Sequence, residues 1–149
     1  MPRFLAIDYG RKRIGLAISD SEGRIASPLV TRPNSAPPVQ AAADVWKWVV
    51  REYEVDAWVV GLPLSMDDSE GPQAKETRAF ADSLAKASGK PVHFWDERLS
   101  SWAADQAMSD AGLTRQKRKD RVDRVAAQMI LQGFLDHRER PNDGSTEGW

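Results

Sequence analysis

Three acidic positions in the chain could act together as ligands of a hard metal ion. Asp8 follows the apolar run FLAI, and the pair Asp96 and Glu97 follows the run VHFW. If both runs are parallel strands of an open α/β sheet, their acids lie at its carboxyl edge, where such sheets gather functional groups. Adjacent residues of an extended chain point to opposite sides, so only one of Asp96 and Glu97 is expected to face Asp8. The spacing leaves open which one.

The third acid, Asp123, interrupts a helical core pattern. It shares one helix face with Ala127, Ile130 and Phe134, at spacings of four, three and four residues. A buried carboxylate without a partner costs several kcal/mol or becomes protonated. The small side chains of Ala126 and Ala127 would let this helix approach a sheet closely. We therefore expect Asp123 to reach inward toward the strand ends that carry the other acids.

The scarcity of softer ligands favours oxygen-based metal chemistry. The chain has no cysteine and only two histidines, His93 and His137. A thiolate site, a disulfide framework and a histidine-rich zinc site are thereby excluded. Three carboxylates suit Mg²⁺ or Mn²⁺. Two such ions about 3.5–4 Å apart can activate a water and stabilise the leaving oxygen in phosphodiester cleavage, so a metal-dependent hydrolase is the leading hypothesis.

Basic residues cluster beside two of the acids, on a chain whose formal net charge is only −1. Bulk attraction to nucleic acid is not expected, so phosphates would have to be held by local patches. Gly10 and Gly15 would permit close backbone approach beside Asp8. The residues that we predict to contact nucleic acid are Arg11, Lys12, Arg13, Arg115, Lys117, Arg118 and Lys119. The run that holds the last four could instead be a solvated start of a helix.

The composition is that of an ordinary globular protein. Hydrophobic residues make up 41% of the 149, which is enough for one core. No apolar run approaches the roughly 20 residues of a membrane span, and a charge interrupts the start of the chain. We expect a cytoplasmic protein with no membrane contact. A single domain over residues 1–138 is expected, with a flexible tail at 139–149.

Alternating and continuous apolar runs predict five strands, over residues 4–9, 13–19, 24–30, 56–63 and 90–97. The first three have short connections and form an antiparallel meander. The last two are separated by helical patterns, so they join the sheet by parallel crossovers. The expected fold is α/β, with a mixed five-stranded sheet of three antiparallel and two parallel strands flanked by helices.

Helical periodicity covers four segments. In the first, apolar residues recur at three-and-four spacing, and we take them as its buried face: Val39, Ala42, Ala43, Trp46, Val49, Val50 and Tyr53. The second segment begins at Pro72 and ends at Gly89. The others span residues 99–110 and 118–137.

Four sequence blocks resemble the YqgF/RuvX family of pre-16S rRNA nucleases, also described as Holliday junction resolvases. They are IDYGRKRIGLAISD, GLPLSMDDSEGPQA, WDERLSS and VDRVAAQMILQGFLD, in this order along nearly the whole chain. Ser65 and Asp68 stand where Asn and Gly are more usual in this family, and Ser100 replaces a usual Thr. These departures affect loops, and the acids are intact.

The resemblance implies a ribonuclease H-like fold and a cytoplasmic hydrolase that processes the 5′ end of pre-16S rRNA during ribosome biogenesis. Carried onto this chain, the catalytic and metal-binding acids of the family are Asp8, Glu97 and Asp123. The resemblance therefore favours Glu97 over Asp96. Structured RNA is the implied substrate, with branched DNA as the alternative.

Each acid also has a purely structural explanation. Asp8 could form a turn with Gly10, since Asp-x-Gly is common turn chemistry. Asp96 could pair with Arg98 or cap a helix that starts before Leu99. A nearby arginine, Arg118 or Arg124, or a backbone donor could satisfy Asp123.

Other functions also fit the sequence. Resolution of a four-way DNA junction requires paired active sites, so it needs a homodimer, and the sequence does not decide between monomer and homodimer. A noncatalytic RNA-binding ribosome-assembly factor would keep the same residues. Actin-like sugar kinases also begin with Asp-x-Gly, but they need two lobes, which one domain of this length cannot supply.

Overall fold

The fold is seen in a computed structural model that describes residues 3–65, 67, 69–99 and 115–138, the stretch 115–122 as backbone only. One sheet holds five strands in the order β3-β2-β1-β4-β5. The strands are β1 (Phe4–Tyr9), β2 (Arg13–Ser19), β3 (Ala26–Pro33), β4 (Ala57–Leu62) and β5 (Val92–Asp96). β1 pairs antiparallel with β2, and β2 with β3, whereas β1–β4 and β4–β5 are parallel. The predicted meander and the two parallel strands are confirmed.

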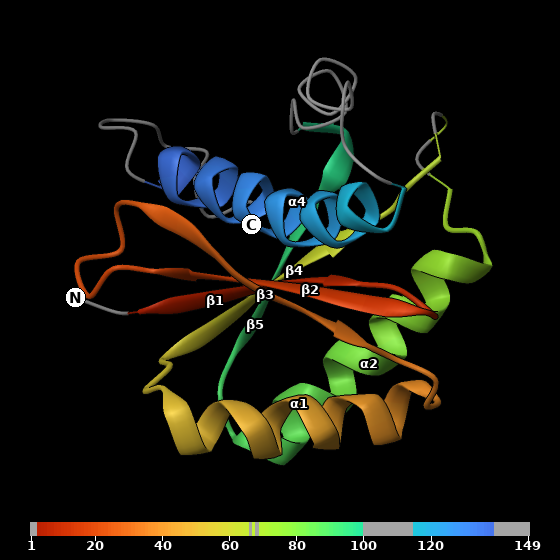
Figure 1. Cartoon of the computed structure of the whole chain (residues 1–149), viewed down its shortest axis with the longest axis horizontal. Coiled ribbons are helices and arrows are strands. Elements are labelled where there is room, and N and C mark those ends of the chain that lie inside the picture. The colour runs from red at the N-terminus through yellow and green to blue at the C-terminus, as the bar shows by residue number, and fades with distance from the viewer. Residues whose placement is uncertain (1–2, 66, 68, 100–114, 139–149) are drawn as a thin grey trace.

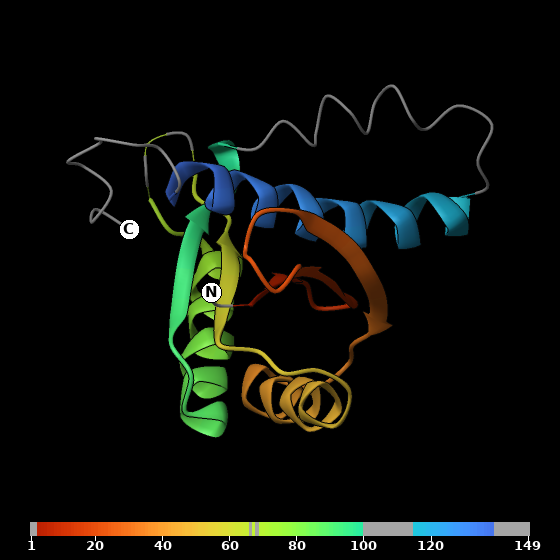
Figure 2. The same ribbon diagram turned by 90° about the vertical axis from the view of Figure 1, so that its left-hand side faces the viewer.

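Helices cover both faces of the sheet. Figure 1 shows α4 (Arg115–Arg138) on one face and α1 (Pro38–Glu52) with α2 (Pro72–Ser88) on the other. Figure 2, turned by 90°, shows the same two layers with α4 running across the sheet. The short 3₁₀ helix η1 (Glu97–Leu99) follows β5 directly. The helix predicted over residues 99–110 lies outside the described residues, except for Leu99.

The alternation of side chains in β1 divides the core in two. Leu5, Ile7 and Tyr9 belong to the cluster beneath α1 and α2. Phe4 and Ala6 belong to the cluster beneath α4. Since side chains alternate across a strand, Asp8 continues the second set and lies on the α4 face. All six residues of β4 are buried, as expected of a parallel strand covered on both faces.

Proline and glycine set the limits of the helices. Pro38 opens α1 and Pro72 opens α2, where the missing N–H of proline costs nothing. Gly89 ends α2 with φ of 70°, a left-handed conformation that favours glycine. The prediction of α2 is confirmed. The last helix begins at Arg115, three residues before the predicted start at 118.

The predicted buried face of α1 was partly wrong. The residues that the sheet and α2 cover are Ala41, Ala42, Val45 and Val49. Val39 and Val50 are 67% and 51% exposed, respectively. Apolar side chains occupy more than one face of this helix, so periodicity alone could not select the buried one. Within the part of the chain that the structure describes, no helix is long and apolar enough to cross a membrane.

Candidate carboxylate site

Asp8 and Asp123 are brought together by a glycine on the neighbouring strand. Asp8 lies opposite Gly15 in the β1–β2 ladder, on the face that α4 covers. A Cβ atom at Gly15 would overlap the carbonyl group of Asp123. The backbone of α4 therefore rests directly on Gly15. The close approach predicted for Gly15 serves the packing of the helix rather than a phosphate.

A second glycine makes room for Glu97. This residue follows the end of β5 and opens η1. A Cβ atom at Gly61 of β4 would lie 3.0 Å from Cγ of Glu97 and 2.5 Å from Cδ1 of Ile130 on α4. The Glu97 side chain therefore lies over β4, in the layer between the sheet and α4. β4 separates β5 from β1 in the sheet, so Glu97 approaches Asp8 across β4.

The three acids interact electrostatically. Burial raises the pKa of Asp8 well above its ordinary range, and the charges of Glu97 and Asp123 raise it further. Burial also raises the pKa of Glu97, with a contribution from Asp96, from its ordinary 4.5 to about 7. A buried acid whose ionisation is disturbed by neighbouring like charges is typical of functional sites. A divalent cation would remove this repulsion.

Asp123 has a cation of its own. Its Oδ2 atom accepts a hydrogen bond from Nε of Arg13 at 2.6 Å, and the two side chains are only 19% and 30% exposed, respectively. The partner comes from β2 rather than from Arg118 or Arg124 on the same helix. Arg13, predicted to contact nucleic acid, neutralises a site carboxylate in this conformation.

Asp96 is held by Arg98. Its carboxylate forms an ion pair with Arg98 at 2.6 Å and accepts the backbone N–H of Arg98 at 3.0 Å. Arg98 also donates to the backbone oxygen of Ser65, which ties η1 to the loop after β4. Hydrogen bonds and the charge of Arg98 lower the pKa of Asp96. The alternative raised by the sequence, an ion pair and helix cap, is confirmed for Asp96.

The predicted phosphate-binding residues differ in how they are held. Arg11 forms an ion pair with Glu76 of α2 at 2.5 Å, with 65% of the arginine side chain exposed. Lys12 is exposed at the tip of the β1–β2 hairpin. The backbone of Arg115, Lys117, Arg118 and Lys119 lies in the first turns of α4, whereas their side chains are outside the described residues.

The donor set of the site suits a hard divalent cation, because all three acids offer carboxylate oxygens. In the described conformation, however, no group of three acidic or histidine side chains is placed to hold a metal ion, among the side chains of residues 3–65, 67, 69–99 and 123–138. The bond from Arg13 to Asp123 provides a physical reason. Asp8, Glu97 and Asp123 therefore have the carboxylate oxygens that a divalent metal ion requires. In this conformation, however, Asp123 forms its ion pair with Arg13.

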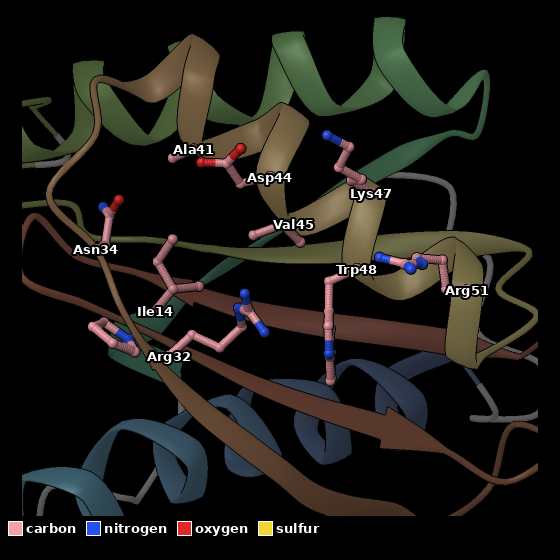
Figure 3. A pocket seen from close by; sticks show the side chains of 10 residues that line it. Ile14, Arg32, Asn34, Ala41, Asp44, Val45, Lys47, Trp48 and Arg51 are labelled. Atoms are coloured by element: carbon pink, nitrogen blue, oxygen red, sulfur yellow. The ribbon is translucent and has the colours of Figure 1, made fainter.

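The sequence did not lead us to predict a site at one further group of residues. A pocket of about 300 Å³ lies on the α1 face and is lined by Arg32, Lys47, Trp48 and Arg51, among others. Figure 3 shows Arg51 extending toward Trp48 on α1 and Arg32 reaching from β3, while Lys47 extends from α1 away from Arg32. Residues 47, 48 and 51 share one helix face by their three-and-four spacing, which is a signal that the sequence contained.

Comparisons with known proteins agree with this architecture. A family model described as "RuvX: Holliday junction resolvase" matches residues 2–137. A protein of Chloroflexus aurantiacus named "Putative pre-16S rRNA nuclease" is 48% identical over 139 residues, which cover 93% of this chain and 90% of the relative. A protein of the same name from Myxococcus xanthus is 44% identical, over 94% of this chain and 91% of its own.

A solved structure supports the fold. T. thermophilus RuvC in complex with a Holliday junction substrate superposes with a TM-score of 0.57 over 93% of this chain and 96% of that one, at 14% identity. A second RuvC structure from Thermus thermophilus gives a TM-score of 0.54 at 15% identity. This likeness concerns the fold alone, which is ribonuclease H-like as predicted. On the match over residues 2–137 and the extent of identity to its relatives, the chain belongs to the RuvX family.

Proposed function

We propose that the protein is a divalent-metal-dependent nuclease that hydrolyses phosphodiester bonds of structured RNA and processes the 5′ end of pre-16S rRNA in the cytoplasm. One observation supports this chemistry. Asp8, Glu97 and Asp123 come from three distant parts of the chain, yet the charges of Glu97 and Asp123 both raise the pKa of Asp8. The substrate follows from the names of the relatives at 44–48% identity. Residues 1–138 form the single domain that bears this activity.

Asp8, Glu97 and Asp123 would hold Mg²⁺ or Mn²⁺. The bound ion supplies positive charge that lowers the pKa of a water and stabilises the leaving oxygen. The raised pKa of Glu97, about 7, means that the site must lose protons before it can bind a cation. Arg13 forms an ion pair with Asp123. If a metal ion took its place on Asp123, the guanidinium of Arg13 would be free to contact a phosphate of the RNA.

The basic residues around the hairpin would position the RNA backbone. Lys12 is exposed and Arg11 is held by a largely exposed ion pair, so both can reach phosphate oxygens. We place Arg115, Lys117, Arg118 and Lys119 in the same role. Such contacts carry affinity and register rather than sequence recognition.

The test is cleavage of an end-labelled pre-16S rRNA 5′ leader in Mg²⁺ or Mn²⁺ by the wild type and by Asp8→Asn. Asp96→Asn is the matched control, because that carboxylate binds Arg98; since its charge also contributes to the raised pKa of Glu97, the substitution should alter the pH dependence of cleavage without abolishing cleavage. Metal-dependent cleavage that Asp8→Asn abolishes and Asp96→Asn retains is the expected result. Cleavage by Asp8→Asn at the wild-type rate would refute the assignment.

A second candidate function is resolution of four-way DNA junctions, which the description of the matching family model favours. A symmetric junction requires two active sites related by a two-fold axis, so this function needs a homodimer. A labelled four-way junction belongs in the same assay, with the oligomeric state measured by light scattering. Cleavage of the junction alone, by a dimer, would replace RNA as the substrate. Binding of RNA by a folded protein that cleaves neither substrate would indicate an assembly factor.

A further inference from the structure

The pocket beside α1 lies on the opposite face of the sheet from the carboxylate site. Figure 3 shows Asp44, Lys47, Trp48 and Arg51 extending from α1, and Arg32 from β3, with α4 on the far side of the strands. The volume of about 300 Å³ is enough for one nucleotide-sized group. No part of the proposed nuclease chemistry uses this pocket.

The position of the pocket follows from the helix and the edge strand. Residues 44, 47, 48 and 51 are spaced as i, i+3, i+4 and i+7, so they form a stripe along one side of α1. This stripe flanks the buried stripe that includes Val45 and Val49. β3 is the edge strand of the sheet, and Arg32 reaches from it toward the stripe. The pocket is therefore bounded by ordered elements on both sides.

The cations of this pocket lack carboxylate partners. Arg11, Arg13, Arg78 and Arg98 each form an ion pair elsewhere in the molecule. By contrast, no ion pair joins Arg32, Lys47 or Arg51 to any carboxylate whose side chain the structure describes, in residues 3–65, 67, 69–99 and 123–138. The one acid in the lining, Asp44, accepts a hydrogen bond from Gln40 at 2.9 Å. The lining therefore holds three cations and one carboxylate, an excess of positive charge on a chain whose net charge is −1.

An aromatic surface accompanies the charge. The guanidinium of Arg32 lies 4.9 Å from the centre of the Trp48 ring, in a cation–π contact. The Trp48 ring also lies 5.9 Å from the ring of Tyr53. An arginine in contact with an aromatic ring, next to further cations, is a combination by which proteins bind single-stranded nucleic acid. An acidic peptide would use the charge but would gain little from the stacked planes.

The pocket is also fastened to the hairpin that leads to the carboxylate site. Asn34 lines the pocket and donates from its side chain to the backbone oxygen of Gly10 at 2.8 Å. Its backbone N–H donates to the oxygen of Lys12, also at 2.8 Å. The rim of the pocket and the basic hairpin tip, residues 10–12, are therefore positioned as one unit.

We propose that this pocket is a second nucleic-acid site, which binds a single-stranded segment away from the scissile bond. Lys47 and Arg51 contact its phosphates, and a nucleobase stacks against the Arg32–Trp48 pair. Binding at this site requires neither a metal ion nor cleavage of the RNA. An experiment can therefore disprove this second site without disproving the proposed nuclease activity, and the reverse.

The test is fluorescence anisotropy with a fluorescein-labelled ten-nucleotide single-stranded RNA of mixed sequence, in EDTA. Lys47→Ala/Arg51→Ala is expected to weaken binding about tenfold or more and to reduce the slope of log K against log salt by about 1.4, since each phosphate contact on a single strand contributes about 0.7. Lys86→Ala/Lys90→Ala removes the same charge from the end of α2 and is the matched control. It should leave both quantities near the wild-type values.

The stacking contribution has a different signature. Trp48→Leu keeps an apolar side chain but removes the ring, so it should weaken binding about fivefold or more while the salt slope stays unchanged. Circular dichroism and thermal unfolding establish that each variant is folded, and Arg32→Gln provides a second probe of the same pair. Equal RNA affinity and salt slope for wild type, Lys47→Ala/Arg51→Ala and Arg32→Gln would overturn the proposal. Displacement of the RNA by poly-glutamate at equal charge concentration would overturn it in favour of an acidic protein partner.

Discussion

The two faces of the sheet carry groups of opposite charge. On the α4 face, three carboxylates share one centre, and one of them is neutralised by Arg13. On the α1 face, Arg32, Lys47 and Arg51 surround a pocket without a carboxylate partner among the described residues. The carboxylates on the α4 face repel one another, and a bound cation would reduce this repulsion. The cations on the α1 face attract an anion directly. We infer that the α4 face performs chemistry and the α1 face contributes affinity.

The largest expected effect separates these roles. Asp8→Asn removes a proposed metal ligand and should lower the rate of RNA cleavage by about three orders of magnitude, while RNA binding in EDTA stays at the wild-type level. Lys47→Ala/Arg51→Ala should show the reverse, with weak binding and a cleavage rate at saturating RNA within about threefold of wild type. Single-turnover cleavage and anisotropy measure the two quantities. If both variants lose the same property, the division between the faces is wrong.

The packing of α4 on Gly15 gives the largest expected effect on stability. Gly15→Ala would place a Cβ atom against the backbone of Asp123, and backbone cannot move aside as a flexible side chain can. We expect a loss of about 3 kcal/mol or more in the free energy of unfolding, or failure to fold. Denaturant unfolding provides the measurement. In the control Gly71→Ala, the added Cβ meets nothing within 4 Å, and the replacement of an N-cap glycine by alanine should cost only about 1 kcal/mol.

The raised pKa of Glu97 predicts that the metal-free protein loses stability as pH rises. Folded Glu97 has a pKa of about 7 against an ordinary 4.5, so the folded state binds more protons between these values. The contribution of Glu97 is therefore full below about pH 4.5 and declines until about pH 7, by about 3 kcal/mol at 1.36 kcal/mol per pH unit.

The difference between wild type and Glu97→Gln isolates this contribution from other acids, such as Asp96, whose pKa is lowered. Urea unfolding in EDTA at pH 5, 6 and 7 should show the variant gaining on the wild type as pH increases. Mn²⁺ at pH 7 should restore the wild type but not Glu97→Gln. A constant difference across this range would show that Glu97 does not titrate as proposed.

The ion pair between Arg13 and Asp123 gives the smallest expected effect. Arg13→Ala leaves Asp123 beside two other acids without a cation, which should cost about 1–3 kcal/mol in EDTA. The same change removes a competitor for Asp123, so Mn²⁺ should bind several-fold more tightly by isothermal titration calorimetry. Arg11→Ala is the control, because its pair with Glu76 is largely exposed and should contribute under about 1 kcal/mol. Weaker Mn²⁺ binding by Arg13→Ala would contradict competition.

Much of the fold could be predicted from local pattern. Alternation in β1 placed Asp8 on the same side as Phe4 and Ala6, and the apolar run of β4 predicted a buried parallel strand. The exposure of Val39 and Val50 could not be predicted, because the apolar residues of α1 cover more than one face. The stripe of residues 47, 48 and 51 was visible as a spacing. Its importance depends on Arg32, which reaches it from a separate strand.

The sequence by itself determined the chemistry available to the protein: carboxylate donors without thiols, basic clusters on a nearly neutral chain, and the order of strands and helices. Tertiary structure decided how these groups are used. It directed Asp96 to Arg98, laid Glu97 over Gly61 and joined Arg13 to Asp123 across 110 residues of sequence. Residue types and periodicities are local properties that a chain carries at every stage of folding. Ion pairs and glycine contacts form only when distant backbones pack within a few ångströms, which the order of residues does not specify.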